Sequence, residues 1–224
     1  MPNSRTEAIA GGAVFGALAS AISYMHLSLP FLPLPYLEFQ FAEIAIVMAV
    51  ILYGPLAGSL ASFEYLIILE MLGQFAPFGP LLAFMGVASI VIGMALGRYL
   101  LYNTSRKRGV WSYAAISILI ASAIRVPLLT IANLAYFYLV APGFISIASS
   151  ELSSFLGNIA ISSFVLVLVF TALFNVIQSL ISIIPATAAS GYIFARWNFY
   201  SIDRYWLPSF IAMESRRENS ISDS

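Results

Sequence analysis

Long apolar runs, separated by short turns of glycine, proline and polar residues, make up most of the chain. These runs predict membrane-crossing helices at Ala8–Leu29, Phe41–Tyr53, Pro55–Leu72, Pro80–Leu101 and Trp111–Val140. Helices are expected because a segment in lipid must satisfy its backbone hydrogen bonds internally. The second run is shorter than the ~20 residues of a full span. We therefore expect it to begin within or near the outer interface.

The last apolar run, Phe155 to Phe194, is too long for one ordinary span. It contains roughly 40 residues, which at ~1.5 Å per residue far exceeds a ~30 Å hydrocarbon core. Two interpretations stay open at this point. The run forms two spans, or it forms one span preceded by a short apolar helix in the outer leaflet.

Composition agrees with a membrane protein. Of 224 residues, 61% are hydrophobic and 9% are charged, whereas a soluble domain carries about 25% charged residues. The fold class is therefore an all-α integral membrane bundle, with lipid as its solvent. The net charge is zero, which gives no reason to expect a nucleic-acid partner.

Basic residues set the predicted orientation, because cytoplasmic loops are enriched in Lys and Arg. The loops around Pro33, Gln74 and Gly143 contain neither residue, so we place them outside. Six crossings over residues 1–207, with both ends in the cytoplasm, leave almost every basic side chain inside. A seventh crossing would put four arginines outside. Residues 208–224 are predicted to be a polar, mobile cytoplasmic tail.

The first span carries alanines at a spacing of four, Ala13, Ala17 and Ala21, beside Gly12 and Gly16. This spacing places small side chains on one face, where another helix can approach closely. The face is either a docking surface for a separate membrane subunit or a packing surface inside the bundle. The second use is the more common one in membrane helices.

Ionisable residues fall inside the predicted spans at Glu43, Glu64, Glu70 and Arg125, whereas Arg98 is assigned to the cytoplasmic end of its span. A buried charge in lipid is costly unless it is paired or hydrated. By their depth along the helices, we expect Arg125 to pair with Glu70 or with Glu64. These residues form either a polar substrate site or a purely structural ion pair.

Aromatic and amide side chains gather near the predicted outer side. Phe39, Phe41, Asn133 and Tyr136 suit a flat heteroaromatic ligand, through stacking and directional hydrogen bonds. Asn175 and Gln178 share one helix face, because they are three residues apart. Interfacial aromatic residues are also common in membrane proteins, and this explanation stays open for Tyr136.

No catalytic or metal-binding motif is recognisable in the sequence. His26 is the only histidine and there is no cysteine, so a multi-histidine or thiolate metal site is excluded. No nucleophile elbow and no phosphate-binding loop is present. We therefore expect a protein that is not an enzyme and has no cofactor. Uphill transport would take its energy from an ion gradient or a partner.

Three stretches carry a resemblance to a known family. The first stretch consists of the alanines of the first span. The segment Leu37–Ile44 and the G-P-L-A-G turn at Gly54–Gly58 form the second. Ala132–Phe137 together with Phe174–Gln178 form the third. In these stretches the chain resembles the substrate-binding S components of energy-coupling factor (ECF) vitamin transporters, in particular the riboflavin type.

The resemblance implies six helices, a ligand pocket beneath the first outer loop, and partnership with a transmembrane coupling subunit and two ATPase subunits. It also implies that Ala13, Ala17 and Ala21 dock on the coupling subunit. Asn133 and Asn175 would contact a vitamin, with riboflavin as the first candidate, and Glu43 would hold the pocket edge.

Two positions depart from the riboflavin type. Gln178 stands in place of a lysine, and Glu64 in place of a frequent basic residue, so the pocket charge differs. Two other functions remain open: a proton-coupled carrier that uses Glu64 or Glu70, and an intramembrane enzyme.

Overall fold

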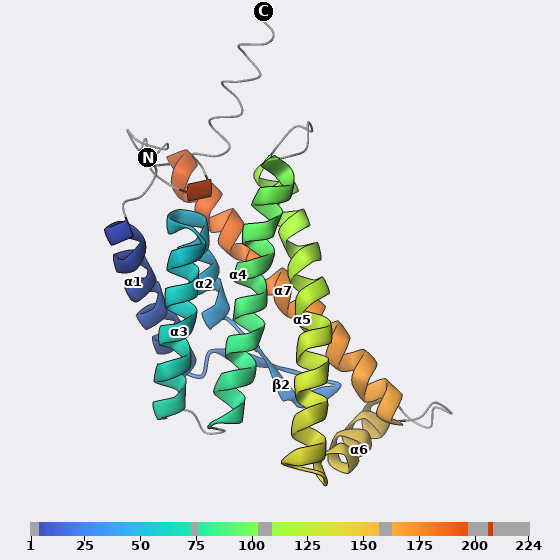
Figure 1. The fold of residues 1–224 in the computed structure, drawn as a ribbon. Helices are drawn as coiled ribbons and strands as arrows, with labels where there is room; N and C mark the ends of the chain where they lie inside the picture. The colour runs from blue at the N-terminus through green and yellow to red at the C-terminus, as the bar shows by residue number, and fades with distance from the viewer. Residues whose placement is uncertain (1–4, 73–75, 103–108, 157–162, 197–205, 208–224) are drawn as a thin grey trace, which may run out of the picture.

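The computed structural model describes residues 5–72, 76–102, 109–156, 163–196 and 206–207. Helices make up most of this part of the chain, and one β-hairpin lies between the first two helices (Figure 1). In chain order the elements are α1 (Arg5–Tyr24), β1 (Ser28–Phe31), β2 (Leu34–Gln40), α2 (Ala42–Tyr53), α3 (Pro55–Leu72), α4 (Phe78–Tyr102), α5 (Val110–Leu139), α6 (Phe144–Leu156) and α7 (Ser163–Arg196).

Five of these helices, α1, α3, α4, α5 and α7, are long and apolar enough to cross a bilayer. The chain is a multi-pass membrane protein. The helix α2 has 12 residues, or ~18 Å at helical rise, so it is too short to cross a ~30 Å core by itself. A sixth crossing and the cytoplasmic location of both ends therefore stay predictions. The predicted tail, 208–224, lies outside the described residues.

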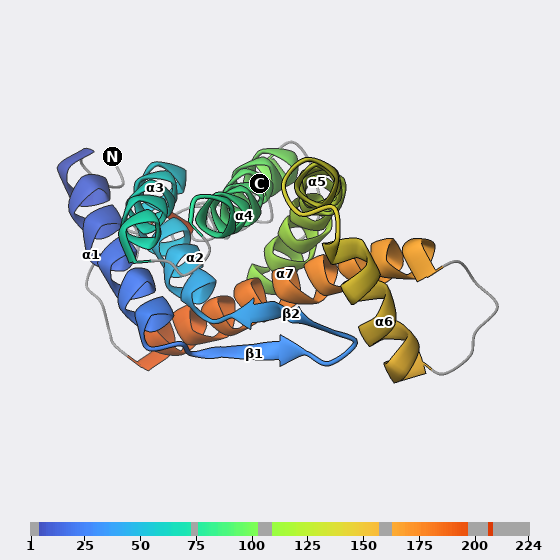
Figure 2. The same ribbon diagram turned by 90° about the horizontal axis from the view of Figure 1, so that it is seen from below.

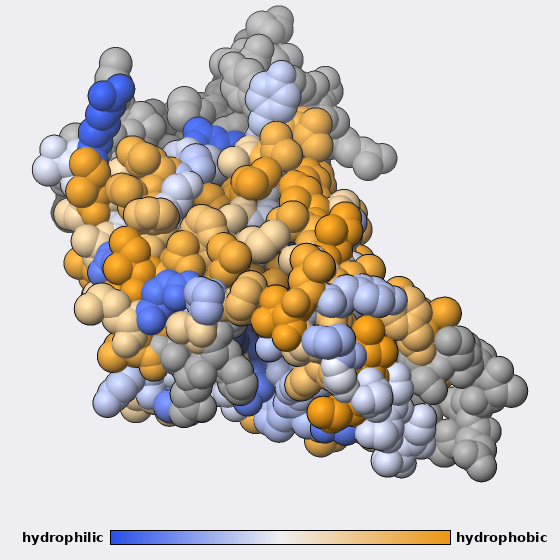
Figure 3. All heavy atoms as spheres, turned by 60° about the horizontal axis from the view of Figure 1, so that its bottom comes forward, coloured by the Kyte–Doolittle hydropathy of each residue, from blue (hydrophilic) through white to orange (hydrophobic). Residues whose placement is uncertain are grey.

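The bundle has two distinct ends. The start of α1 and the end of α7 lie at one end, and the hairpin and α6 lie at the other (Figure 1). Seen from the hairpin end, β1 and β2 extend across the bundle below α7, and α6 crosses α7 beside the end of α5 (Figure 2). Apolar side chains cover the flank of the bundle, and polar residues gather toward the hairpin end (Figure 3).

The hairpin corrects the prediction of an all-α fold. The strands are antiparallel, with Ser28 opposite Gln40 and Phe31 opposite Leu34, and the turn between them contains Leu32 and Pro33. The first helix consequently ends at Tyr24 and not at the predicted Leu29. Hydropathy could not show this difference, because residues 25–29 are nearly as apolar as the helix before them.

The last apolar run forms one long helix, α7, and the short helix α6 precedes it. The structure therefore favours the single-span interpretation over two spans. The short helix nevertheless begins at Phe144, earlier than expected. Residues 157–162, in which the predicted run has its first part, lie outside the described residues.

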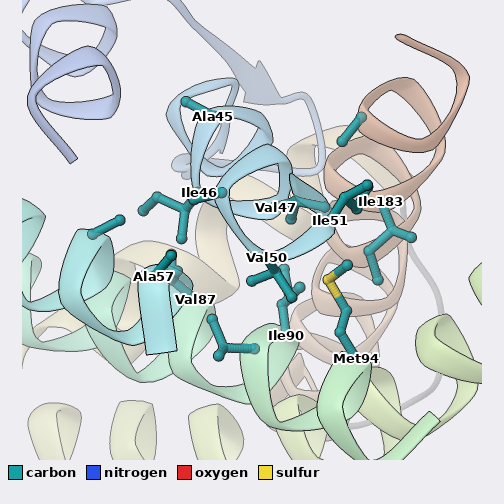
Figure 4. Close-up of a cluster of buried hydrophobic side chains, with 14 of the residues drawn as sticks. Ala45, Ile46, Val47, Val50, Ile51, Ala57, Val87, Ile90, Met94 and Ile183 are labelled. Atoms are coloured by element: carbon teal, nitrogen blue, oxygen red, sulfur yellow. The ribbon is translucent and has the colours of Figure 1, made fainter. Parts of the chain in front are cut away.

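The short helix α2 lies at the centre of the main hydrophobic core. Its buried side chains include Ala45, Ile46 and Val50, and they pack with residues of α3, α4 and α7 (Figure 4). The other core residues labelled in that view are Val47, Ile51, Ala57, Val87, Ile90, Met94 and Ile183. Burial on all sides explains why α2 reads as a continuous apolar run.

The predicted turn after α2 is confirmed. Gly54 has φ +93°, a left-handed value that costs little only for glycine. The indole of Trp206 packs against it, because a Cβ at Gly54 would lie 2.8 Å from that ring. The Arg98 guanidinium lies 4.3 Å from the centre of the same indole, within the range of a cation–π interaction.

The helices α4 and α5 approach each other closely at two glycines. A Cβ added at Gly93 would lie 2.6 Å from the backbone nitrogen of Ala121, and one at Gly97 would lie 2.6 Å from Ser117 Oγ. Small residues permit this backbone contact, as is common between membrane helices.

We expect Gly93→Ala to destabilise the protein by about 1–3 kcal/mol, because the added methyl group collides with the backbone of α5. Gly191→Ala is the matched control. Nothing lies within 4 Å of a Cβ at Gly191, so that variant should be neutral or more stable by about 0.5–1 kcal/mol. Equilibrium unfolding in detergent measures both. Equal effects of the two substitutions would contradict the close α4–α5 contact.

Candidate functional site

A buried ion pair joins α2 to α5. Arg125 donates from Nη1 to Glu43 Oε2 and from Nη2 to Glu43 Oε1, each over 2.9 Å. The two residues are only 4% and 1% exposed. Two parallel hydrogen bonds between charged groups are the strongest arrangement available to such a pair. The pair therefore satisfies both charges inside the bundle.

The prediction that Arg125 pairs with Glu64 or Glu70 is therefore wrong. Glu64 lies on the face of α3 that meets α1, where its Oε2 is 2.5 Å from a Cβ built at Gly16. Glu70 lies in the last turn of α3, which ends at Leu72. The pairing was predicted from depth along the helices, and depth could not give the rotation of α3 that turns Glu64 toward α1.

Side chains of α7 complete the network around the pair. Arg125 Nε donates to Asn175 Oδ1 over 3.1 Å, and Asn175 Nδ2 donates to the Thr171 carbonyl over 2.9 Å. Ser182 Oγ donates to Glu43 Oε2 over 2.7 Å. The sequence-predicted residues Glu43, Arg125 and Asn175 therefore lie together, and their polar groups bond to one another.

Gln178 fastens the hairpin to α7. Its Nε2 donates to the Gln40 carbonyl over 3.0 Å, and its Oε1 accepts from the Gln40 backbone nitrogen over 3.1 Å. The Gln40 side chain in turn accepts from the Tyr65 hydroxyl over 3.0 Å. A neutral amide suits this role, because it can both donate to and accept from one backbone unit.

An aromatic cluster lies between the hairpin, α5, α6 and α7. Phe39 stacks on Phe174 with ring centres 4.9 Å apart, and Phe137 stacks on Phe144 with centres 5.5 Å apart. Tyr36 meets Phe144 edge-on, with centres 4.9 Å apart. The residues of this aromatic cluster are Phe31, Tyr36, Phe39, Tyr136, Phe137, Phe144, Phe170 and Phe174.

The structure places the predicted aromatic and amide residues as follows. Phe39 and Tyr136 belong to the aromatic cluster. Phe41 lies just before α2, and Asn133 is partly buried one helical turn before Phe137. The assignment of all these residues to substrate binding stays a prediction.

Sequence reasoning missed two polar residues next to the aromatic cluster, Tyr36 and Glu151. The Tyr36 hydroxyl and Glu151 Oε2 are inaccessible to solvent and form no hydrogen bond of good geometry among the described residues, although the Thr171 side chain lies near the Tyr36 hydroxyl. Burial raises the pKa of Tyr36 to about 12; the nearby Thr171 side chain offsets part of the rise, and Glu151 adds to it. Glu151 lies in a serine-rich stretch, and no motif distinguishes it there.

The two small-residue faces of α1 have different surroundings. Gly12 and Gly16 are buried against α3, whereas Ala13, Ala17 and Ala21 are exposed. Packing inside the bundle is therefore provided by the glycines, and the alanine face is left open.

No group of three potential metal ligands occurs within the described part of the chain.

No family model and no curated protein matches the sequence. A solved structure does match: the S component of a bacterial ECF transporter, at 21% identity and a TM-score of 0.59. The match covers 87% of this chain and 100% of that chain. The chain shares the fold of an ECF S component.

The shared fold supports the resemblance to ECF S components, whereas the count of six crossings remains a prediction. At this level of identity the likeness extends to the arrangement of the helices. The riboflavin-type specificity remains a prediction, because it depends on side chains that the fold does not determine.

The ion pair gives a direct test of the site. Arg125→Leu and Glu43→Leu should each destabilise the protein by about 3–5 kcal/mol, because each leaves one buried charge unpaired. The double variant should be closer to wild type than the sum of the two losses. A double-mutant cycle in detergent unfolding measures this coupling.

The control is the same double-mutant cycle carried out between Glu64 and Arg125. We expect the coupling energy between these two residues to be near zero. Strong coupling there, with none between Glu43 and Arg125, would contradict the observed pairing.

Proposed function

We propose that this chain is the substrate-capturing subunit of an ECF-type importer for a vitamin-like aromatic molecule. The observation that carries the proposal is the shared fold, which spans the whole of the S-component chain. In this proposal the hairpin end faces outward, and the start of α1 faces the cytoplasm. The protein binds and presents its ligand but performs no chemistry on it.

The aromatic cluster supports a ligand site at the hairpin end. Stacked and edge-on rings provide flat apolar surfaces, which favour a planar heteroaromatic ligand. The hairpin covers this cluster, since its residues Phe31 and Phe39 pack against Phe174 of α7. A ligand that separates these rings would be enclosed beneath the hairpin.

Riboflavin is the first candidate, with Asn133 and Asn175 as contacts. Asn175 is engaged by Arg125, so a ligand would have to compete for it. Asn133 is the more accessible of the two amides.

The open alanine face of α1 supports docking on a separate membrane subunit. Around Ala13, Ala17 and Ala21 the same side of α1 exposes Ile9, Val14 and Leu18. Small residues allow close approach of a second helix, and the flanking aliphatic side chains enlarge the contact. We propose a transmembrane coupling subunit as the partner, with two ATPase subunits supplying the energy.

Ala17→Trp should abolish association with the coupling subunit, because a large indole blocks the approach of a helix. Ligand binding should remain unchanged, since Ala17 is exposed on the outer face of α1 and makes no contact in the aromatic cluster. The control is Ala123→Trp, which alters an exposed alanine on α5, across the bundle from α1 (Figure 2). Co-purification of tagged subunits measures association, and retained association of Ala17→Trp would refute the docking face.

The ligand and the energy source need separate experiments. Absorbance and mass spectrometry of the purified protein identify what it carries, and a stoichiometric flavin would establish riboflavin. Uptake in proteoliposomes should require the coupling subunit and ATP. Uptake by the chain alone, driven by a proton gradient, would instead establish a self-sufficient carrier that uses Glu64 or Glu70.

A further inference from the structure

Two polar atoms without partners lie at the edge of the aromatic cluster. One is the Tyr36 hydroxyl on β2, and the other is Oε2 of Glu151 on α6. Leaving a buried polar group without a hydrogen bond costs about 1–3 kcal/mol, and more when the group is charged. The strand and the helix lie against each other, since the Tyr36 ring meets Phe144 of α6 edge-on with centres 4.9 Å apart. Such a pair calls for a specific explanation.

The helix α6 positions the carboxylate. Ala148 and Leu152 are buried in the same apolar cluster as Phe137 and Phe174, so this face of α6 points into the protein. Glu151 precedes Leu152 and follows Ala148 by three residues, and it is therefore next to the inward face. On the other side, Ser150, Ser153 and Ser154 are exposed and bond to α6 carbonyls.

The charge balance around Glu151 is negative. No Lys or Arg occurs in β1, β2 or α6, and within α7 the only basic residue is Arg196 at its far end. The basic residue nearest along α5, Arg125, is held by Glu43 through two hydrogen bonds. Glu151 therefore has no basic counterpart on the described elements that surround it.

Building on the proposed function, we propose that the ligand is a flat aromatic ring bearing a positive charge or an N–H donor, bound by Glu151 and Tyr36 within the aromatic cluster. An ionised carboxylate only accepts hydrogen bonds, so its partner must donate. A cationic ring also gains from the faces of the surrounding phenylalanines. An anionic ligand would meet an uncompensated carboxylate.

Three small probes of one shape test this specificity in the full chain, reconstituted in lipid nanodiscs. Benzamidine is cationic and donates N–H bonds, methyl benzoate is neutral without donors, and benzoate is anionic. Saturation-transfer NMR with titration measures their affinities. We expect benzamidine to bind at least about tenfold more tightly than either other probe, as one charge-assisted hydrogen bond allows.

Glu151→Gln should remove this preference, and Glu151→Asp should restore part of it. Tyr36→Phe keeps the ring and removes the hydroxyl, so it should weaken benzamidine binding several-fold. Glu38→Gln is the control, because Glu38 is an exposed glutamate of β2 that accepts a bond from Ser28. It should leave the preference unchanged.

A thermal melt separates a ligand-binding role from a structural one. Because Glu151 Oε2 is buried without a hydrogen bond, which is unfavourable for folding, Glu151→Gln should melt at or above the wild-type temperature. A lower melting temperature would show that Glu151 supports the fold and would overturn the proposal. So would equal or tighter binding of benzoate or methyl benzoate, absence of benzamidine binding, or a preference that survives in Glu151→Gln.

A different measurement, association with the coupling subunit, tests the proposed function itself. If the charge preference is absent but the coupling subunit still associates through α1, only the ligand class is wrong. If association is also absent, the assignment as a capture subunit is wrong as well.

Discussion

The buried Arg125–Glu43 pair is the constraint on which the rest of the structure depends. Two opposite charges inside an apolar bundle are tolerated only when they meet with good geometry. Their two hydrogen bonds hold the first turn of α2 against the middle of α5, and Asn175 and Ser182 add α7 to the same point. A helix too short to cross the membrane alone is thereby fixed inside it.

The position of α2 determines where the hairpin lies. Strand β2 ends at Gln40, two residues before α2 begins, so the strand must leave the network at the level of the ion pair. Gln178 then binds the backbone of Gln40 on both sides. Hydrogen-bonded polar groups thus hold the α2 end of β2, whereas the Tyr36 hydroxyl, farther along β2, and Glu151 Oε2 on α6 are buried without a hydrogen bond. In the proposed function, the first groups build the site and the second are available to a ligand.

The sequence predicted the elements that depend on local hydropathy and missed those that depend on contacts between elements. Membrane helices were predictable because lipid imposes a length and a composition on each of them. The pairing of Arg125 with Glu43 and not with Glu64 was not predictable, because it depends on how α3 is rotated against α1. The hairpin was missed because its residues are as apolar as a helix end, and strand pairing between Ser28 and Gln40 has no local signal. Glu43, Arg125 and Asn175 were each predicted as candidate site residues from their type and position, but their bonding to one another required the fold.

The helix α1 combines two kinds of small residue that the sequence alone does not separate. Glycines on one face let α3 approach, and alanines on the other face remain open. The same helix continues into β1 through only three residues, Met25, His26 and Leu27, and His26 holds a left-handed backbone conformation with φ 54°. So short a connection leaves little slack between α1 and the hairpin. In the proposed function, a partner that tilted α1 through its alanine face would therefore act directly on the strands that cover the aromatic cluster, and docking at one surface would be linked to ligand enclosure at the other.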